Sequence, residues 1–143
     1  MTHQTDLANF IRRFETLSLE NVGKIGELYS TEAYFKDPFN EVSGHAAIIA
    51  IFEHMFKQVD APRFVVTSNI LKGEEAFIVW DLFFQTKNQA HTDQRIHGSS
   101  HLRFAADGRV FYHRDYWDTA EELYEKIPVL GSLMRFLKRK LRA

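Results

Sequence analysis

Residues 94–117 read QRIHGSSHLRFAADGRVFYHRDYW, two β-rich runs separated by Asp107-Gly108. Asp-Gly between alternating residues is typical of a two-residue hairpin turn. That turn sets the cross-strand pairs, which are Gly98–Trp117, Ser100–Asp115, Leu102–His113 and Phe104–Phe111. The face that these pairs share is mainly apolar, and three polar side chains interrupt it: Ser100, His113 and Asp115.

The opposite face of the same hairpin is polar and aromatic. Its side chains include His97, His101, Arg103, Tyr112, Arg114 and Tyr116. A face of this composition suits solvent or a second subunit. We predict a homodimer that forms through it.

Upstream of the hairpin, apolar residues recur with helical spacing at 7–17 and 45–59, with a shorter helix at 22–29. Asp6 is the expected N-cap of the first helix, and Pro62 marks the exit of the third. A short hairpin is predicted at 33–42, and a strand at 64–71.

Residues 76–86, AFIVWDLFFQT, are nearly all apolar, which predicts a strand covered on both faces. The resulting order is helices, a short hairpin, a helix and then long antiparallel strands, which is an α+β arrangement. The sheet must curve around the N-terminal helices to bury their apolar stripes. We therefore expect a curved antiparallel sheet wrapped around helices, with an internal apolar pocket.

The chain has 143 residues, enough for one domain with a real core. We place that domain at 1–128 and a basic amphipathic C-terminal helix at 129–143. The 13 Phe residues fit either a Phe-rich core or a roomy pocket for an apolar ligand, and composition alone leaves both open.

Charge is distributed unevenly along the chain. Residues 131–143 hold five bases and no acid, and the rest holds 13 bases against 19 acids, a net charge of −6. An acidic body argues against nucleic-acid binding. In the tail, an apolar stripe lies opposite the bases; its members are Leu130, Leu133, Met134, Leu137 and Leu141. Two interpretations stay open: packing on the domain or on a partner subunit, which we favour, or reversible contact with an anionic membrane.

The N-terminus lacks the pattern of a signal peptide, and no apolar run approaches the roughly 20 residues of a membrane span. A cytoplasmic location is expected, possible membrane contact through the tail aside. No cofactor is expected, and no metal either: the chain has no Cys, and His97 and His101 lie about 13 Å apart on a strand.

Two carboxylates stand out because they interrupt apolar surroundings. Asp115 lies on the apolar face of the hairpin, and Asp81 is the one charge in residues 76–86. A buried carboxylate costs several kcal/mol unless it is paired or protonated. Each is explained either by a structural hydrogen bond or by chemistry. If both reach one cavity, they can share a proton and act as acid and base, with His113 orienting them or serving as a base.

Several segments resemble the bacterial ketosteroid isomerases of the nuclear transport factor 2-like, or SnoaL-like, superfamily. They are residues 34–39 (YFKDPF), 44–45 (GH), 103–104 (RF), 107–110 (DGRV) and 116–117 (YW). The resemblance implies a cone-shaped fold and makes Asp37 the base that moves a proton next to a carbonyl. The two oxyanion donors of those enzymes correspond to Phe14 and Ser100 here, so both are missing or weakened. Their Trp near the end of the last strand matches Trp117.

Residues 114–118, RDYWD, also resemble the limonene-type epoxide hydrolases. On that likeness Asp115 is the water-activating base and Asp81 is the second acid. The Arg that those enzymes carry two residues before that acid is Val79 here, and their Tyr-x-Asn positions resemble Phe35 and Asp37.

These observations lead to two functional hypotheses. The first is a small-molecule isomerase or hydrolase that acts on an apolar substrate through carboxylate acid–base chemistry. Its catalytic candidates are Asp37, Asp81, Asp115 and His113, and its substrate-binding candidates are Phe14, Phe35, Ser100, Leu102 and Trp117. The second, motivated by the missing oxyanion donors, is a non-catalytic module that binds an apolar ligand or acts as a dimeric scaffold.

Overall fold

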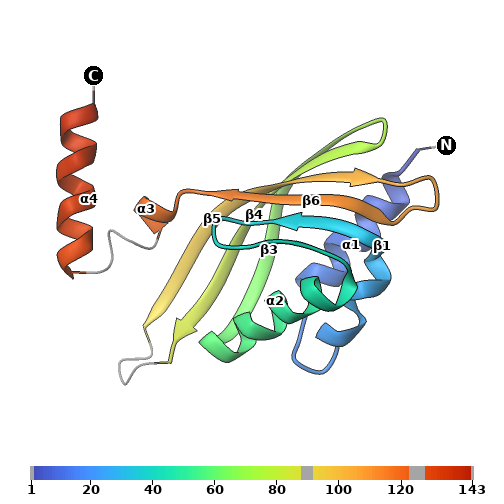
Figure 1. Ribbon diagram of the computed structural model, residues 1–143, viewed down its shortest axis with the longest axis horizontal. Coiled ribbons are helices and arrows are strands. Elements are labelled where there is room, and N and C mark those ends of the chain that lie inside the picture. Colours follow the sequence, from blue (N-terminus) through green and yellow to red (C-terminus); the bar gives the residue numbers. More distant parts are fainter. Residues whose placement is uncertain (1, 88–91, 123–127, 143) are drawn as a thin grey trace.

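The structure is a computed structural model and describes residues 2–87, 92–122 and 128–142. Helices α1 (Gln4–Glu15) and α2 (His45–Gln58) and the 3-10 helix η1 (Val22–Leu28) lie on one side of a curved sheet (Figure 1). The strands are β1 (Tyr29–Lys36), β2 (Glu41–Ser43), β3 (Val59–Lys72), β4 (Glu75–Thr86), β5 (Asp93–Phe104) and β6 (Val110–Trp117). Two C-terminal helices follow, α3 (Thr119–Glu122) and α4 (Pro128–Leu141).

The six strands form one sheet in the order β2-β1-β6-β5-β4-β3. All neighbours are antiparallel except β1 and β6, which run parallel. This parallel pair joins the first and last strands of the chain, so the N-terminal hairpin lies beside the C-terminal one. The α+β fold with a curved sheet on helices is confirmed.

Aromatic side chains fill the space between the helices and the sheet. Phe10 and Phe14 of α1 stack at 4.6 Å, and Phe14 meets Phe52 of α2 edge-on at 5.2 Å. Phe35 of β1 contacts Phe52 from the sheet side at 5.6 Å. Edge-to-face pairs of this kind add to the gain from burial. Much of the Phe content therefore forms core.

The register of β5 and β6 follows the hairpin prediction over most of its length. Gly98 pairs with Trp117, Ser100 with Asp115, and Leu102 with His113. The prediction is wrong near the turn, where Phe104 pairs with Val110 after a register shift. The turn is longer than two residues, because the Ala105 amide bonds to the Arg109 carbonyl. The shift turns Val110, which is fully buried, into the core in place of Phe111.

Two expected boundaries differ as well. Helix α1 begins at Gln4, so Asp6 lies inside its first turn, where it bonds to His3, and is not the N-cap. Pro62 follows the end of α2 at Gln58, as predicted, but it also lies inside β3, which begins directly after that helix. It is tolerated because β3 is an edge strand with a register shift between Asp60 and Arg63, where no regular ladder bond is lost.

Strand β4 is covered on one face only. Ala76, Ile78 and Trp80 are buried, whereas Phe77 is 46% exposed, so the expectation of cover on both faces is wrong for the single chain. The homodimer predicted through this outer face stays a prediction. Within the described ranges, no helix is long and apolar enough to cross a membrane.

Candidate functional site

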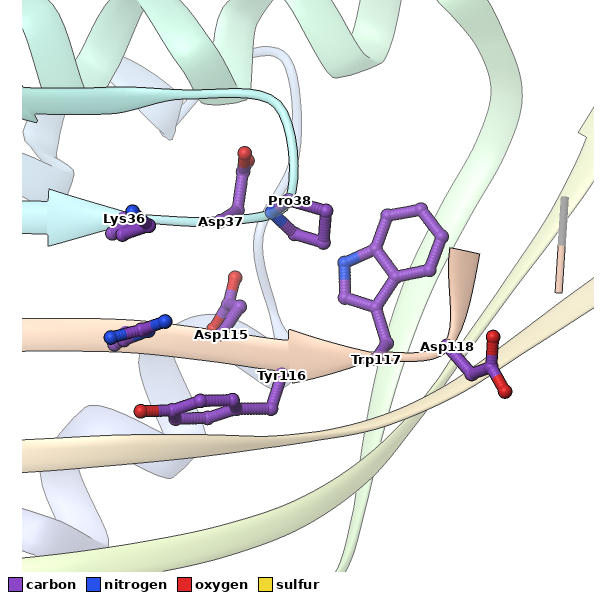
Figure 2. Close-up of a pocket in the computed structure, with 8 residues that line it drawn as sticks. Lys36, Asp37, Pro38, Asp115, Tyr116, Trp117 and Asp118 are labelled. Atoms are coloured by element: carbon purple, nitrogen blue, oxygen red, sulfur yellow. The ribbon is translucent and has the colours of Figure 1, made fainter. Parts of the chain in front are cut away.

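A pocket of about 480 Å³ lies where β1 and β6 end side by side (Figure 2). The lining residues are Lys36, Asp37, Pro38, Arg114, Asp115, Tyr116, Trp117 and Asp118. The parallel pairing of Phe35 with His113 and of Lys36 with Arg114 creates this site, because it brings both strand ends to one level. The pocket lies at the end of the sheet, beside the ends of β1 and β6, and differs from the internal apolar pocket that we expected.

Asp115 lies on the inner face of β6, and its side chain is 16% exposed. One of its oxygens, Oδ1, accepts hydrogen bonds from Ser100 Oγ at 2.5 Å and from His113 Nε2 at 2.6 Å. Among the described residues, Oδ2 receives no hydrogen bond. One oxygen is thus held by the protein and the other is left to the pocket.

A chain of buried hydrogen bonds continues behind Asp115. Tyr29 Oη lies 2.7 Å from His113 Nδ1, and Trp80 Nε1 donates to Ser100 Oγ at 2.8 Å. Burial, and then the charge of Asp115, raise the pKa of Tyr29 well above its usual value. The phenol therefore keeps its proton and can donate it to Nδ1 of His113, and Nε2 is then the nitrogen that donates to Asp115.

The imidazole of His113 is fixed by aromatic packing as well as by these bonds. It lies 4.8 Å from the Phe35 ring and 5.7 Å from the Phe10 ring, and its residue is 2% exposed. Phe14 and Tyr29 pack against it from α1 and β1, both at 6.0 Å. A ring held in this way orients Asp115 and has no access to a ligand of its own.

Asp37 shares the pocket with Asp115, and Figure 2 shows the two carboxylates pointing the same way from neighbouring strand ends. Its Oδ1 accepts from the backbone amides of Phe39 at 2.8 Å and Asn40 at 2.6 Å. The Asn40 side chain adds bonds of 3.1 Å to both carboxylate oxygens. Asp37 therefore stabilises the turn that forms one wall of the pocket.

Trp117 forms the apolar wall of the pocket. Its ring meets Phe39 edge-on at 5.8 Å, and Figure 2 shows its indole nitrogen on the side of Pro38 and Asp115. Opposite Trp117 on β5 lies Gly98, where an added Cβ would come within 2.6 Å of the Trp80 ring. The glycine thus makes the space that lets Trp80 reach Ser100.

The rim of the pocket carries compensated charge. Lys36 Nζ bonds to Glu41 at 3.2 Å, and this bond, followed by one from Tyr34, holds the pKa of Glu41 below its usual value. The Arg114 guanidinium lies 4.7 Å from the centre of the Tyr116 ring. The bases of the rim thus have partners of their own, and the pocket interior is left to carboxylates and the indole.

Asp81 lies on the other face of the sheet. It pairs with His97 across β4 and β5, and its Oδ1 lies 2.7 Å from His97 Nδ1 and 3.9 Å from Arg95 Nε. Because Asp115 faces inward opposite Ser100, the two carboxylates share no cavity. The condition under which they could share one proton is therefore not met.

The predicted substrate contacts are divided by the structure. Trp117 lines the pocket, whereas the other four are at most 6% exposed; they are Phe14, Phe35, Ser100 and Leu102. Ser100 supports Asp115 from the core, and the remaining three pack beneath the site. Their role as ligand contacts stays a prediction.

Sequence reasoning missed Tyr29 and Trp80, which complete the hydrogen-bond chain, and Arg114, which lies on the rim. The hairpin pattern gave the facing pair Ser100–Asp115, but nothing local indicated that β1 would join β6. Among residues 2–87, 92–122 and 128–142, no cluster of His, Asp or Glu could hold a metal ion.

Comparisons with known proteins agree with this architecture. A family model described as "SnoaL-like domain" matches residues 10–113. The comparison with curated proteins gave no match.

Solved structures with this fold are numerous and distant in sequence. One is a hypothetical protein with a ketosteroid isomerase-like fold from Catenulispora acidiphila, in complex with trimethylamine. It has a TM-score of 0.72 and 14% identity over 84% of this chain and 90% of that one. A putative isomerase from Bacillus subtilis has a TM-score of 0.69 and 20% identity over 82% and 90%. A putative SnoaL-like polyketide cyclase from Shewanella denitrificans has 0.67 and 16% over 85% and 96%.

Proposed function

This chain belongs to the SnoaL-like domain family, and from that premise we propose that it is a cofactor-independent enzyme that moves a proton on a small molecule. Asp115 is the general base. The observation that carries the proposal is the asymmetry of its carboxylate: Asp115 lines the pocket, Oδ1 is held by Ser100 and His113, and Oδ2 receives no hydrogen bond from the described residues. A base needs an oriented lone pair within reach of the substrate, and this arrangement supplies one.

The reaction class follows from what Oδ2 can reach. On a β,γ-unsaturated ketone, Oδ2 takes a proton from the carbon beside the carbonyl, and the C–H electron pair moves into a new C–C double bond as charge builds on the carbonyl oxygen. Return of that proton to the γ-carbon completes an isomerisation and restores the carboxylate. On an epoxide, the same oxygen takes a proton from water as the water oxygen bonds to a ring carbon and the C–O bond at that carbon breaks. The ring oxygen then takes a proton from solvent and Asp115 releases its proton to solvent, which gives a diol and restores the carboxylate. Both reactions need no redox partner, and we propose an isomerase or a hydrolase of this kind.

The charge that develops on the substrate needs a hydrogen-bond donor. Ser100 is not available for this role, because its hydroxyl proton is directed at Asp115. The indole N–H of Trp117 has no hydrogen-bond acceptor among the described residues and lies on the pocket side of its ring. We propose that Trp117 donates to the substrate oxygen and that its ring, with Pro38, packs against the apolar part of the substrate.

The test compares two isosteric substitutions. Deuterium exchange and product formation are followed by proton NMR in D₂O with a panel of cyclic β,γ-enones and terpene epoxides. Asp115→Asn keeps an acceptor for Ser100 and His113 but removes the base, so turnover falls by about 10²-fold or more while the melting temperature stays close to wild type. Asp81→Asn is the matched control and stays within about twofold of wild type.

Full activity in Asp115→Asn contradicts this assignment of the base. Loss of folding in Asp115→Asn gives the carboxylate a structural role instead.

A second candidate function is ligand binding without turnover. Three acidic residues line this pocket together with an indole ring, namely Asp37, Asp115 and Asp118 with Trp117, and this composition suits a small organic cation. The Catenulispora protein of the same fold was solved in complex with trimethylamine. Calorimetry with trimethylammonium tests this candidate: binding that is lost in Trp117→Leu, with no turnover on any panel compound, favours the binding module over the enzyme.

A further inference from the structure

Helix α4 exposes an apolar surface that the body of the molecule does not cover. Figure 1 shows α4 standing apart from α1, α2 and the sheet. Four large apolar side chains of α4 are between 42% and 84% exposed, and they are Leu133, Phe136, Leu137 and Leu141. The side chain of Leu130, which the sequence adds to this stripe, lies outside the described side chains. An exposed apolar stripe of this size marks an interaction surface.

The opposite side of α4 carries most of its bases. Four of them lie across the helix from the stripe, and they are Arg135, Lys138, Arg139 and Arg142. Lys140 lies on the stripe side, between Leu133 and Phe136. Residues 128–143 contain no acid, so five positive charges are not offset within the segment. Lys140 Nζ lies 5.6 Å from the centre of the Phe136 ring, so the stem of this lysine runs over the apolar surface of the stripe. A lysine on apolar surface can keep its stem there while its ammonium group reaches water or headgroups.

The length of α4 limits how it can meet a bilayer. Its 14 residues span about 21 Å at 1.5 Å per residue, which is less than the roughly 30 Å hydrocarbon core. A helix this short, apolar on one side and basic on the other, lies in the plane of the interface with its apolar side down.

Two surfaces could cover this helix, the acidic body of the same chain and an anionic membrane, and they differ in how well they match its two sides. The rest of the chain carries −6, which would draw the basic side of α4 toward it, yet the apolar side would then still face water. An anionic bilayer accepts both sides at once, because acyl chains take the stripe and headgroups take the bases. We propose that α4 is a reversible anchor for anionic membrane surfaces.

The anchor lies close to the pocket in the chain. The last strand ends at Trp117, a lining residue, and α4 begins at Pro128. In Figure 1 the end of β6, α3 and α4 occupy the same end of the molecule. Attachment through α4 therefore holds the pocket within reach of apolar molecules dissolved in the membrane. The anchor itself does not depend on whether the pocket is catalytic.

Co-sedimentation with vesicles tests the anchor on the full-length protein. Vesicles of phosphatidylcholine with 30% phosphatidylserine are expected to pellet the protein at 50 mM salt, whereas pure phosphatidylcholine vesicles are not. Raising the salt to 1 M shortens the screening length to about 3 Å and releases the protein. No pelleting with anionic vesicles, or equal pelleting with both kinds, overturns the proposal.

Paired variants separate the stripe from the bases. Leu133→Gln with Leu137→Gln is expected to weaken partitioning at least tenfold, since two leucines no longer enter the acyl region. Its control is Leu19→Gln with Ile70→Gln, which removes two equally large side chains, 63% and 68% exposed, from the body and leaves binding unchanged.

Lys138→Gln with Lys140→Gln is expected to weaken binding by about twenty-five-fold, because each base near such a surface contributes about fivefold. Lys24→Gln with Lys72→Gln, two exposed lysines of the body, is its control. Stripe variants that pellet like wild type overturn the proposal. So does a stripe variant that changes only the solution mass from dimer to monomer, because the stripe then covers a second copy of this chain.

Discussion

Asp115 and Asp81 lie on opposite faces of one sheet and are almost equally buried, with side chains 16% and 13% exposed. Their neighbours differ. Asp81 is bound to His97 and lies near Arg95, whose side chains are 51% and 58% exposed. Asp115 is bound to Ser100 and His113, which are both 2% exposed, and a pocket lies on its free side.

Burial alone therefore does not distinguish the carboxylate that we propose as the base from the one on the outer face. On the outer face, the partners of Asp81 are exposed, so water can replace their bonds to the carboxylate at little cost in stability. On the inner face, the partners of Asp115 are held in place by the core. They bind Oδ1, and Oδ2 receives no hydrogen bond from the described residues. The partners of a carboxylate, and what faces its second oxygen, decide what it can do.

The largest expected contrast is between the two histidines. His113→Ala removes a ring packed among four aromatic residues and leaves Tyr29 without an acceptor, so the free energy of unfolding falls by about 3 kcal/mol or more. His97→Ala removes an exposed ring and changes it by about 0.5 kcal/mol. Urea unfolding at pH 7 measures both. Equal losses would mean that the inner hydrogen-bond chain is no more tightly built than the outer pair.

A smaller effect is expected at the glycine that admits Trp80. In Gly98→Ala the new Cβ meets the Trp80 ring at 2.6 Å and Trp117 Cβ at 3.1 Å, and the strain costs about 2 kcal/mol. Gly23→Ala is the control, because an added Cβ there meets no atom within 4 Å. Thermal unfolding compares the two. Unchanged stability in Gly98→Ala would mean that the Trp80–Ser100 contact is not confined as the structure has it.

Alkaline unfolding probes the far end of the inner chain. Because the pKa of Tyr29 is raised in the folded state, the folded protein keeps a proton that the unfolded chain releases above about pH 10. The stabilisation is full below that pH and is lost as the pH rises further, at up to about 1.4 kcal/mol per pH unit. In Tyr29→Phe this part of the slope is absent. A variant whose stability falls as steeply as wild type between pH 10 and 11 contradicts the prediction.

The smallest effect is expected for the outer pair. A double-mutant cycle on Asp81→Asn and His97→Gln is expected to give a coupling energy of at most about 1 kcal/mol, reduced by 0.5 M salt. Coupling well above this value and insensitive to salt would show that the outer face is shielded, as the predicted homodimer would shield it. Measuring the coupling energy at two protein concentrations distinguishes an outer face that is exposed from one that is covered in a homodimer.

The surroundings of Asp115 on the inner face of the sheet could be predicted in large part from the sequence. The alternation around Asp107-Gly108 set the facing pairs Ser100–Asp115 and Leu102–His113, although a longer turn moved Val110 rather than Phe111 into the core. Side chains of a strand alternate between the two faces of the sheet, so the local sequence indicates which residues share a face. The register shift at the turn does not change the pairs farther along the strands.

The placement of Asp81 on the outer face could not be predicted in the same way. Residues 76–86 are apolar on both faces, so their pattern does not say which way Asp81 points, and the sequence of residues 87–92 contains no Gly or Pro that would predict a tight turn. Its placement follows from the register with β5, where Asp81 meets His97. The adjacency of Asp37 and Asp115 depends on the parallel pairing of β1 with β6, two segments far apart in the chain, which no local pattern encodes.

A crystal structure with a bound small molecule tests the central claim most directly, namely that Asp115 Oδ2 is the group offered to the ligand. A fragment or enone soaked into the pocket is expected to place a polar atom or an acidic carbon within about 3.2 Å of Oδ2, with Ser100 and His113 still bound to Oδ1. A ligand that fills the pocket while Oδ2 is covered by another protein group, or that binds beside Asp81 instead, would contradict the account.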